Sequence, residues 1–326
     1  MEAVSSSLPW LNTLSTPLVL LGVLLLHRYL PLPEHYHPLA LLRGLATNLQ
    51  KKVFPSSDRP PSQQQIASVL GATLLILPFV LILLILGGLS EYPALWQGLM
   101  LYLSLDWEHS RRRAINIAAQ LEKGYKVQAR ESLGHLVCRK SARLSSLGIL
   151  KATIESVLQR ANLQLFAVLF WYVIAGGVAA LTYRGIRELA MQWNPKREKF
   201  RYFGAPISAM VLVLDWLPAR LLALSYALSG NLSRWAKHSL NWLGKFPNNQ
   251  AGLLVSCGAD ALKTELGGPL YYDKHKQQRP RINQGTAPEP ITIIKALSLI
   301  RNSIGFWIAL LLMGYCGLLL LELLGV

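Results

Sequence analysis

Long apolar stretches alternate with shorter polar and basic stretches along the 326 residues of the chain. A helix that crosses a bilayer needs about 20 mostly apolar residues. Residues 8 to 30, 66 to 88 and 304 to 326 meet this requirement. The second stretch carries no charged residue, and the third carries only Glu322 near its end. The pattern therefore predicts an all-α, polytopic integral membrane protein.

Three further stretches are less regular. Residues 93 to 105 are apolar but short, and residues 163 to 183 are interrupted by the pair Gly176-Gly177. Residues 205 to 228 enclose Asp215, Pro218 and Arg220. Such groups at membrane depth are typical of elements that line a cavity or lie at the interface. We expect four full crossings and two partial elements.

The positive charges lie between the apolar stretches. The formal net charge is +16, and Lys and Arg follow the first helix but do not precede it, which places the amino terminus outside and the following loop inside. A full crossing by residues 163 to 183 would put the basic segment 184 to 201 outside. We therefore predict that 163 to 183 and 205 to 228 are re-entrant or shallow. The scattered charge does not form the continuous stripe that binds nucleic acid, so we expect no nucleic-acid partner.

The remaining segments are expected in the cytoplasm. Residues 107 to 160 have helical periodicity, and residues 231 to 303 are expected to form a loop region. Both belong to a single membrane domain over residues 1 to 326. The apolar face of the first segment consists of Ile115, Ala118, Leu121, Leu133, Leu136 and Val137.

The chain contains none of the general catalytic signatures. It lacks a phosphate-binding G-x-x-x-x-G-K-[ST] string, an H-E-x-x-H string and a G-x-S-x-G string. Its three cysteines do not have the spacing of a zinc site, and the sequence predicts no metal ligands. Composition and periodicity thus lead only to a polytopic membrane protein.

Short strings spread over most of the chain carry a further signal through their order. They are His37-Pro38, Ala129-Arg130, Val137-Cys138-Arg139-Lys140-Ser141, Ala152-Thr153-Ile154-Glu155-Ser156-Val157, Leu169-Phe170-Trp171, Gly176-Gly177, Tyr202-Phe203-Gly204, Leu217-Pro218-Ala219-Arg220-Leu221, Asn249-Gln250-Ala251-Gly252, Leu266-Gly267-Gly268-Pro269 and Tyr271-Tyr272. In this order they resemble the CobD/CbiB family of cobalamin biosynthesis. Each string is weak alone, and the shared order makes the resemblance specific.

The resemblance implies an adenosylcobinamide-phosphate synthase-like protein, which joins aminopropanol or its phosphate to adenosylcobyric acid through an amide bond. It implies ATP and Mg²⁺ as cofactors if this activity is retained. The chain departs from the family at acidic positions, because Lys140, Leu163 and Leu212 stand where the family has acidic residues. Whether the protein is an enzyme therefore stays open, and no catalytic residue is assigned. The substrate-binding candidates are Arg139, Glu155, Tyr202, Gly204, Asp215, Arg220, Asn249, Gly252, Gly267 and Gly268.

Two other functions stay open. The string from Val213 to Arg220 also resembles AmpE, a non-catalytic membrane sensor linked to cell-wall signalling. A structural subunit that holds partner enzymes together is the third alternative. In the first reading the protein lies in the bacterial inner membrane and binds a corrinoid at the cytoplasmic face. Membrane lipids, a second copy of the chain or cobalamin-pathway enzymes are its expected partners.

Several candidates have a structural alternative. Arg220 could pair with Asp215 or extend to the membrane surface, and Glu155 could form a surface ion pair with Lys151, four residues away on a helix. Residues 267 to 268 could form a plain turn instead of a phosphate-binding loop.

Two further residue types are expected at the membrane surface. His37 is predicted to cap or anchor a helix there. Four tryptophans are predicted to be interfacial aromatics, namely Trp171, Trp193, Trp216 and Trp307.

Overall fold

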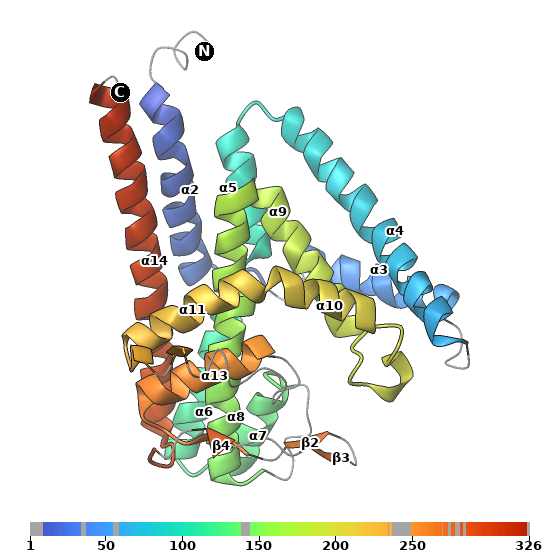
Figure 1. Cartoon of the computed structure of the whole chain (residues 1–326), viewed down its shortest axis with the longest axis vertical. Helices are drawn as coiled ribbons and strands as arrows, with labels where there is room; N and C mark the ends of the chain where they lie inside the picture. Colours follow the sequence, from blue (N-terminus) through green and yellow to red (C-terminus); the bar gives the residue numbers. More distant parts are fainter. Residues whose placement is uncertain are drawn as a thin grey trace. The chain divides into compact units, whose positions relative to one another are not determined.

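The structure of the protein is a computed structural model. It describes residues 9 to 33, 37 to 54, 59 to 137, 144 to 233, 235 to 236, 249 to 268, 270 to 272, 275 to 277, 281 to 282 and 285 to 324. In residues 9 to 16, 249, 270 to 277 and 322 to 324 only the backbone is described. Helices dominate (Figure 1), which confirms the all-α fold class.

The chain forms two compact units, each discontinuous in sequence. Unit 1 consists of residues 1 to 105, 167 to 215 and 310 to 326, and unit 2 consists of residues 106 to 166 and 216 to 309. Because neither unit is one continuous stretch, this division does not test the prediction of a single domain over residues 1 to 326.

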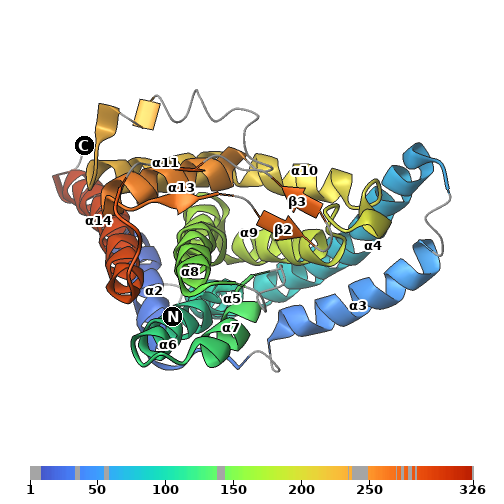
Figure 2. The ribbon, with the colours of Figure 1, turned by 90° about the horizontal axis from the view of Figure 1, so that it is seen from below.

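In the part of unit 1 that the structure describes, six whole α-helices and one short 3₁₀-helix accompany the last part of α14 (Pro290–Leu324), from residue 310 onward. They are α2 (Pro9–Tyr29), α3 (Pro38–Val53), α4 (Pro61–Gly88), α5 (Pro93–Ser104), α9 (Ala167–Gln192), η2 (Glu198–Phe200) and α10 (Ala205–Leu214). Helix α9 packs against α3, α4, α5 and α10, and Figure 2 shows it between α3 and α10.

The described residues of unit 2 form helices and four very short strands. Its elements are α6 (Trp107–Glu122), α7 (Lys126–Gly134), α8 (Ser146–Ala161), the π-helix η1 (Asn162–Phe166), α11 (Trp216–Leu228), α13 (Asn249–Leu262), β1 (Leu266–Gly267), β2 (Leu270–Tyr272), β3 (His275–Gln277), β4 (Arg281–Ile282) and the first part of α14 (Pro290–Leu324). Strand β1 pairs antiparallel with β4, and β2 pairs antiparallel with β3. The loop expected over residues 231 to 303 thus contains α13, the beginning of α14 and two small strand pairs.

Three helical segments in the described part of the chain are long and apolar enough to cross a membrane. They are Pro61–Gly88, Ser146–Gln192 and Pro290–Leu321, and the broken pair α10 and α11 would make a fourth. The segment at the carboxyl end begins well before the predicted residue 304. These helices make the chain a membrane protein; the predicted side of each loop stays a prediction.

Helix α9 is interrupted where the sequence contains the pair Gly176-Gly177. Ala175 and Gly176 leave helical geometry, and Gly176 has φ +80°. Figure 1 shows that α9 changes direction along its length. The N–H of Gly177 donates to the side-chain oxygen of Gln97 in α5, and a Cβ at position 177 would lie 2.7 Å from the backbone oxygen of Gln97. The glycine pair therefore permits both the break and the close approach of α5.

The aromatic core of unit 1 joins the end of α3 to the connection between α9 and α10. Phe203 packs against Phe54 and Trp193, with ring centroids 4.7 and 5.0 Å away. Trp193 is fully buried in this cluster, so its assignment as an interfacial aromatic is wrong. A tryptophan next to a basic loop indicates an interface by composition, but here its ring fills the core.

The buried face of α6 differs from the predicted one. Ala114, Ile117 and Ala118 are buried, whereas Ile115 and Leu121 are only half-buried. The prediction is thus confirmed for Ala118, and for Leu133 and Leu136 beyond α6, which are buried. Within α6, only Ile115 and Leu121 lie at the edge of the buried face and not on it. Residues 107, 110, 114, 117 and 118 share one face at 3.6 residues per turn, and this face includes the polar Ser110, which an apolar pattern overlooks.

Candidate functional site

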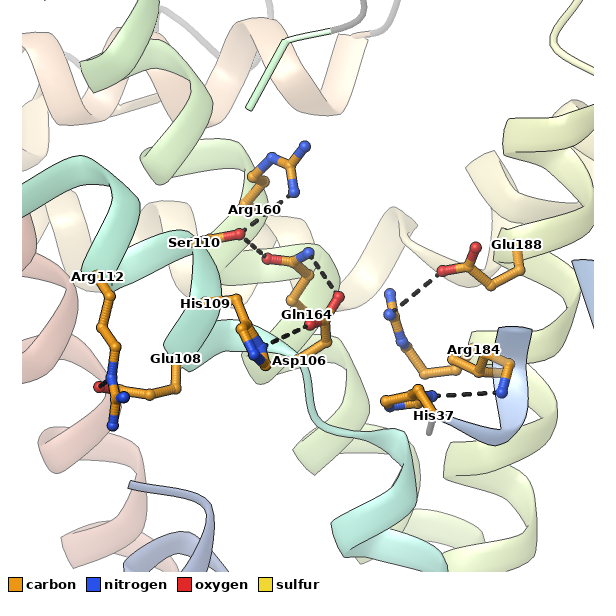
Figure 3. A network of polar contacts seen from close by, with 11 residues as sticks. His37, Asp106, Glu108, His109, Ser110, Arg112, Arg160, Gln164, Arg184 and Glu188 are labelled. Atoms are coloured by element: carbon orange, nitrogen blue, oxygen red, sulfur yellow. Dashed lines mark hydrogen bonds and ion pairs between the residues drawn. The ribbon is translucent and has the colours of Figure 1, made fainter. Parts of the chain in front are cut away.

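A polar network in unit 2 begins at the amino end of α6. Asp106 precedes this helix, and its Oδ1 lies 3.4 Å from Nδ1 of His109. Its Oδ2 accepts a hydrogen bond of 3.2 Å from Nε2 of Gln164. Figure 3 shows these three side chains pointing toward one another. The carboxylate thus lies within ion-pair distance of the imidazole and is itself held by an amide.

Two further side chains extend this network. The Oγ of Ser110 donates to Oε1 of Gln164 at 2.7 Å and accepts from Nη1 of Arg160 at 3.2 Å. Arg160 also donates to the backbone oxygen of Leu136, 2.9 Å from Nη2. Each side chain is thus held by its neighbour in a continuous series of polar contacts (Figure 3). The series runs from Arg160 through Ser110, Gln164 and Asp106 to His109. We call these five residues the dyad network, after the pair Asp106 and His109.

The π-helix η1 places Gln164 in the dyad network. Single-turn π-bulges are rare and occur frequently at functional sites. Asn162, at the beginning of η1, is 1% exposed, and neither polar atom of its side chain has a hydrogen-bond partner. Leaving a buried amide without partners costs about 1–3 kcal/mol. The π-helix η1 therefore places two polar side chains, Asn162 and Gln164, among buried apolar residues.

A second carboxylate on α6 has a structural function. Glu108 is buried and accepts from Arg111 at 2.6 and 2.8 Å and from Arg112 at 3.0 Å. Such charge-assisted hydrogen bonds are short and strong. Arg111 and Arg112 are therefore paired with a carboxylate of their own helix.

Glu155 has a backbone partner. It is buried on α8, and its Oε1 accepts from the N–H of Gly267, 2.9 Å away. The amino group of Lys151 lies 2.7 Å from Glu265, a pairing that the alternative of a Lys151–Glu155 surface pair did not include. The hydrogen bond from Lys151 lowers the pKa of Glu265 below its ordinary value.

The turn at Gly267-Gly268 is occupied by the protein itself. Both residues have positive φ, +77° and +100°, which glycine adopts at little cost. The N–H of Gly267 is donated to Glu155. The plain-turn alternative therefore accounts for Gly267 better than a phosphate-binding loop does.

Unit 1 has a charged cluster on α9 and α3, in which Arg184 and Glu188 are buried and Arg43 is partly exposed. Nη2 of Arg184 lies 3.4 Å from Oε1 of Glu188, and Nε of Arg43 lies 3.8 Å from its Oε2. His37 begins α3, where its Nδ1 accepts from the N–H of Leu39 at 3.3 Å. The predicted role of His37 as a helix cap is thus confirmed, and Figure 3 shows it beside this region.

Asp215 belongs to the same unit and is 2% exposed. It accepts from the hydroxyl of Tyr183 at 2.5 Å, and its Oδ2 lies 3.6 Å from Nη1 of Arg187. Charged residues at membrane depth are costly unless they are paired. Asp215 is therefore held by two partners from α9, whereas Arg220 stacks on the ring of Trp216, 4.1 Å from its centroid.

The other sequence candidates fall at structural positions or outside the described residues. Tyr202 is exposed, and Arg201 lies over its ring. At Gly204 a Cβ would lie 1.6 Å from the backbone oxygen of Trp193. The backbone oxygen of Gly252 accepts from Ser256 within α13. Arg139 and the side chain of Asn249 lie outside the described residues.

The described residues do not form a magnesium site. No group of three His, Cys, Asp or Glu side chains that could hold a metal occurs among them. Mg²⁺ prefers several oxygen ligands in octahedral geometry. The buried carboxylates of Glu108, Glu188 and Asp215 are engaged by arginines, and Glu155 is engaged by a backbone N–H.

Unit 1 also contains an apolar cavity of about 330 Å³ between α4, α9 and α10. Trp171, Thr182, Tyr183 and Met210 are among its lining residues. The break at Ala175 forms part of its wall. An apolar lining with one hydroxyl from each of two residues suits an apolar group better than a charged one.

The dyad network contains none of the ten sequence candidates. Asp106 comes directly before an amphipathic helix, which indicates an ordinary helix cap. In the structure its side chain makes no capping hydrogen bond. An aspartate, a histidine and a serine within five residues at the start of this helix could have indicated a polar site. The contribution of Gln164 could not be predicted in this way, because it depends on the π-helix.

Comparisons with known proteins agree with the order of strings in the sequence. The profile of the family described as CobD/Cbib protein matches residues 20–300. The chain is 31% identical to "Cobalamin biosynthesis protein CobD" of Chromobacterium violaceum over 293 residues, covering 88% of this chain and 93% of that protein. It is 31% identical to the protein of the same name from Stutzerimonas stutzeri, covering 92% and 98%.

A more distant relative carries the second family name. "Cobalamin biosynthesis protein CbiB" of Salmonella typhimurium is 27% identical over 227 residues, covering 67% of this chain and 70% of that protein. No solved structure matches the chain significantly. Nothing in these comparisons supports the AmpE-like alternative. With a family profile that matches most of its length and relatives of 31% identity along nearly all of both chains, this protein belongs to the CobD/CbiB family.

Proposed function

We propose that this protein acts in cobalamin biosynthesis as an adenosylcobinamide-phosphate synthase-like membrane protein. It joins an aminopropanol or its phosphate to adenosylcobyric acid through an amide bond. The observation that carries this proposal is the match to proteins named for cobalamin biosynthesis over 88% and 92% of the chain. The protein is a multi-pass protein of the bacterial inner membrane and binds its corrinoid at the cytoplasmic face.

The dyad network is our candidate for the proton transfer in this reaction. The amine nitrogen forms a bond to the carbonyl carbon of the activated carboxyl group, the activating group leaves, and the amine loses a proton. Asp106 stabilises a protonated His109, as a carboxylate does for an imidazole that serves as general base. Gln164 and Ser110 hold Asp106 in position.

Product formation tests this proposal. Purified protein in detergent is incubated with adenosylcobyric acid, aminopropanol phosphate, ATP and Mg²⁺, and the amide is detected by mass spectrometry. The amide product is expected. Corrinoid binding without product would indicate a carrier or scaffold and not a synthase. The absence of both corrinoid binding and amide product would contradict a cobalamin function.

A pair of variants tests the dyad network separately. His109→Gln is expected to lower kcat at least 100-fold, within the range for a general base, and to remove the acidic limb of the pH profile. Lys123→Gln, an exposed change after the end of the same helix, is the control and is expected to retain activity. Equal kcat and an unchanged pH profile for His109→Gln would exclude His109 as the base.

A further inference from the structure

The end of α3 and the connection from α9 to α10 carry six exposed cations. They are Lys51, Lys52, Lys196, Arg197, Lys199 and Arg201, and we call them the basic rim. The sequence adds one acidic residue in each segment, Asp58 and Glu198. Asp58 lies outside the described residues. Positive charge therefore dominates both segments.

Packing brings the two segments of the basic rim together. Phe54 directly follows α3, and its ring centroid lies 5.9 Å from that of Phe200 and 4.7 Å from that of Phe203. All three aromatic side chains are buried. Segments that share a buried core cannot lie on opposite sides of a bilayer. Residues 51 to 54 and 196 to 203 therefore lie on one side of the membrane.

This constraint agrees with the break in α9. A straight crossing through residues 163 to 183 would place residues 196 to 203 on the side opposite the preceding loop. Helix α9 instead changes direction (Figure 1), and Ala175 and Gly176 are the residues that leave helical geometry. The later part of α9 then packs against α3 through the cluster of Arg43, Arg184 and Glu188.

Apolar surfaces begin directly beside the basic rim. Helix α10 starts at Ala205 and exposes Met210 and Val213, and α4 exposes Ile66 and Leu70. Tyr202, between the rim and α10, is 42% exposed and stacks with Arg201. This order is found at the head-group level of a membrane, where cationic side chains are followed by an amphipathic aromatic residue and then by lipid-facing apolar side chains.

We propose that the basic rim is a binding surface for the head groups of anionic phospholipids. The anchored surface holds the end of α3 and the α9–α10 connection on the same, cytoplasmic leaflet. Each lysine or arginine near an anionic surface contributes a factor of about five in affinity.

Lipid titration of the purified full-length chain tests the proposal. The probes are short-chain phosphatidylglycerol and short-chain phosphatidylcholine, followed by intrinsic fluorescence in detergent. Lys196→Gln/Lys199→Gln is expected to weaken phosphatidylglycerol binding about 25-fold, by the factor of five for each charge. The matched control Lys123→Gln/Lys126→Gln removes the same charge elsewhere and is expected to change it less than twofold.

Cysteine labelling tests the sidedness without reference to affinity. Glu198→Cys and Lys52→Cys are expected to react with a membrane-impermeant maleimide in inside-out vesicles and not in right-side-out vesicles, above the background of the parent protein. Labelling of the two positions from opposite sides would overturn the proposal. Equal losses of lipid binding in both double variants, no loss in either, or full competition by inorganic phosphate would also overturn it.

Discussion

Replacement of Glu155 by alanine tests whether this carboxylate shapes the fold or holds a ligand. In the structure its Oε1 accepts from the N–H of Gly267, 2.9 Å away, and the side chain is 5% exposed. A hydrogen bond to a charged group contributes about 1.5–3 kcal/mol. The variant also leaves the N–H of Gly267 without this acceptor. We expect the free energy of unfolding to fall by about 3 kcal/mol in total.

The conservative variant separates the two roles. Glu155→Gln keeps an oxygen acceptor at the same place and loses only the charge assistance, which corresponds to about 1 kcal/mol. At about 2–4 °C for each kcal/mol, Glu155→Ala should lower the unfolding midpoint by about 6–12 °C and Glu155→Gln by about 2–4 °C. The assay is thermal unfolding in detergent, followed by near-ultraviolet circular dichroism.

Activity measured on the same preparations completes the test. If Glu155 supports the turn, Glu155→Gln should retain most of the corrinoid binding while Glu155→Ala loses both stability and binding. Unchanged midpoints in both variants together with lost activity would refute the structural reasoning. That result would make Glu155 a ligand-binding residue.

Three further predictions concern single positions. Gly204→Ala should destabilise the protein by more than about 3 kcal/mol, because its Cβ would overlap the backbone oxygen of Trp193 and the backbone must move; thermal unfolding measures this. The hydrogen bond from Lys151 lowers the pKa of Glu265 from its ordinary value of 4.5. The pair therefore stabilises the folded state above pH 4.5 and loses this effect as the pH falls through the lowered pKa. The unfolding midpoint of Glu265→Gln should depend less on pH in that range. Burial raises the pKa of Cys257 to about 12, so its thiol should resist maleimide at pH 7 until the protein unfolds, as peptide mass analysis would report.

Each of these predictions has a clear control. Gly44→Ala lies in a helix with open space at the Cβ, so it should be neutral or stabilising, because alanine favours helix more than glycine does. Lys151→Met should reproduce the reduced pH dependence of Glu265→Gln. The chain unfolded in denaturant is the control for Cys257, which should then react with maleimide. An equal midpoint for Gly204→Ala and wild type, an unchanged acid response, or rapid labelling of Cys257 would contradict the respective argument.

The helical membrane class followed directly from the sequence, because apolar length alone determines it. The sequence also located the break in α9, since Gly176 adopts a left-handed conformation that other residues rarely adopt. It did not reveal the length of the last helix. The polar residues at the beginning of α14 lie outside an apolar window, but they continue the same hydrogen-bonded helix from Pro290.

The candidate site was harder to predict for physical reasons. Glu155 and Asp215 stay candidates for substrate binding, and the sequence did not indicate their partners, Gly267 and Tyr183, which lie 112 and 32 residues away. Such contacts follow from tertiary packing and leave no local pattern. The dyad network was missed because Gln164 reaches Asp106 through a π-turn, and the sequence pattern of an ordinary helix does not reveal that turn.

Growth of a bacterium that lacks its own CobD/CbiB protein tests the central claim most directly. The strain expresses this chain and depends on cobalamin, and it is supplied with either cobyric acid or cobinamide. The amide-forming step lies between these two compounds. We predict growth on both compounds with this chain, and growth on cobinamide only without it. Growth on cobinamide alone, with the chain present in the membrane at normal abundance, would contradict the proposed function.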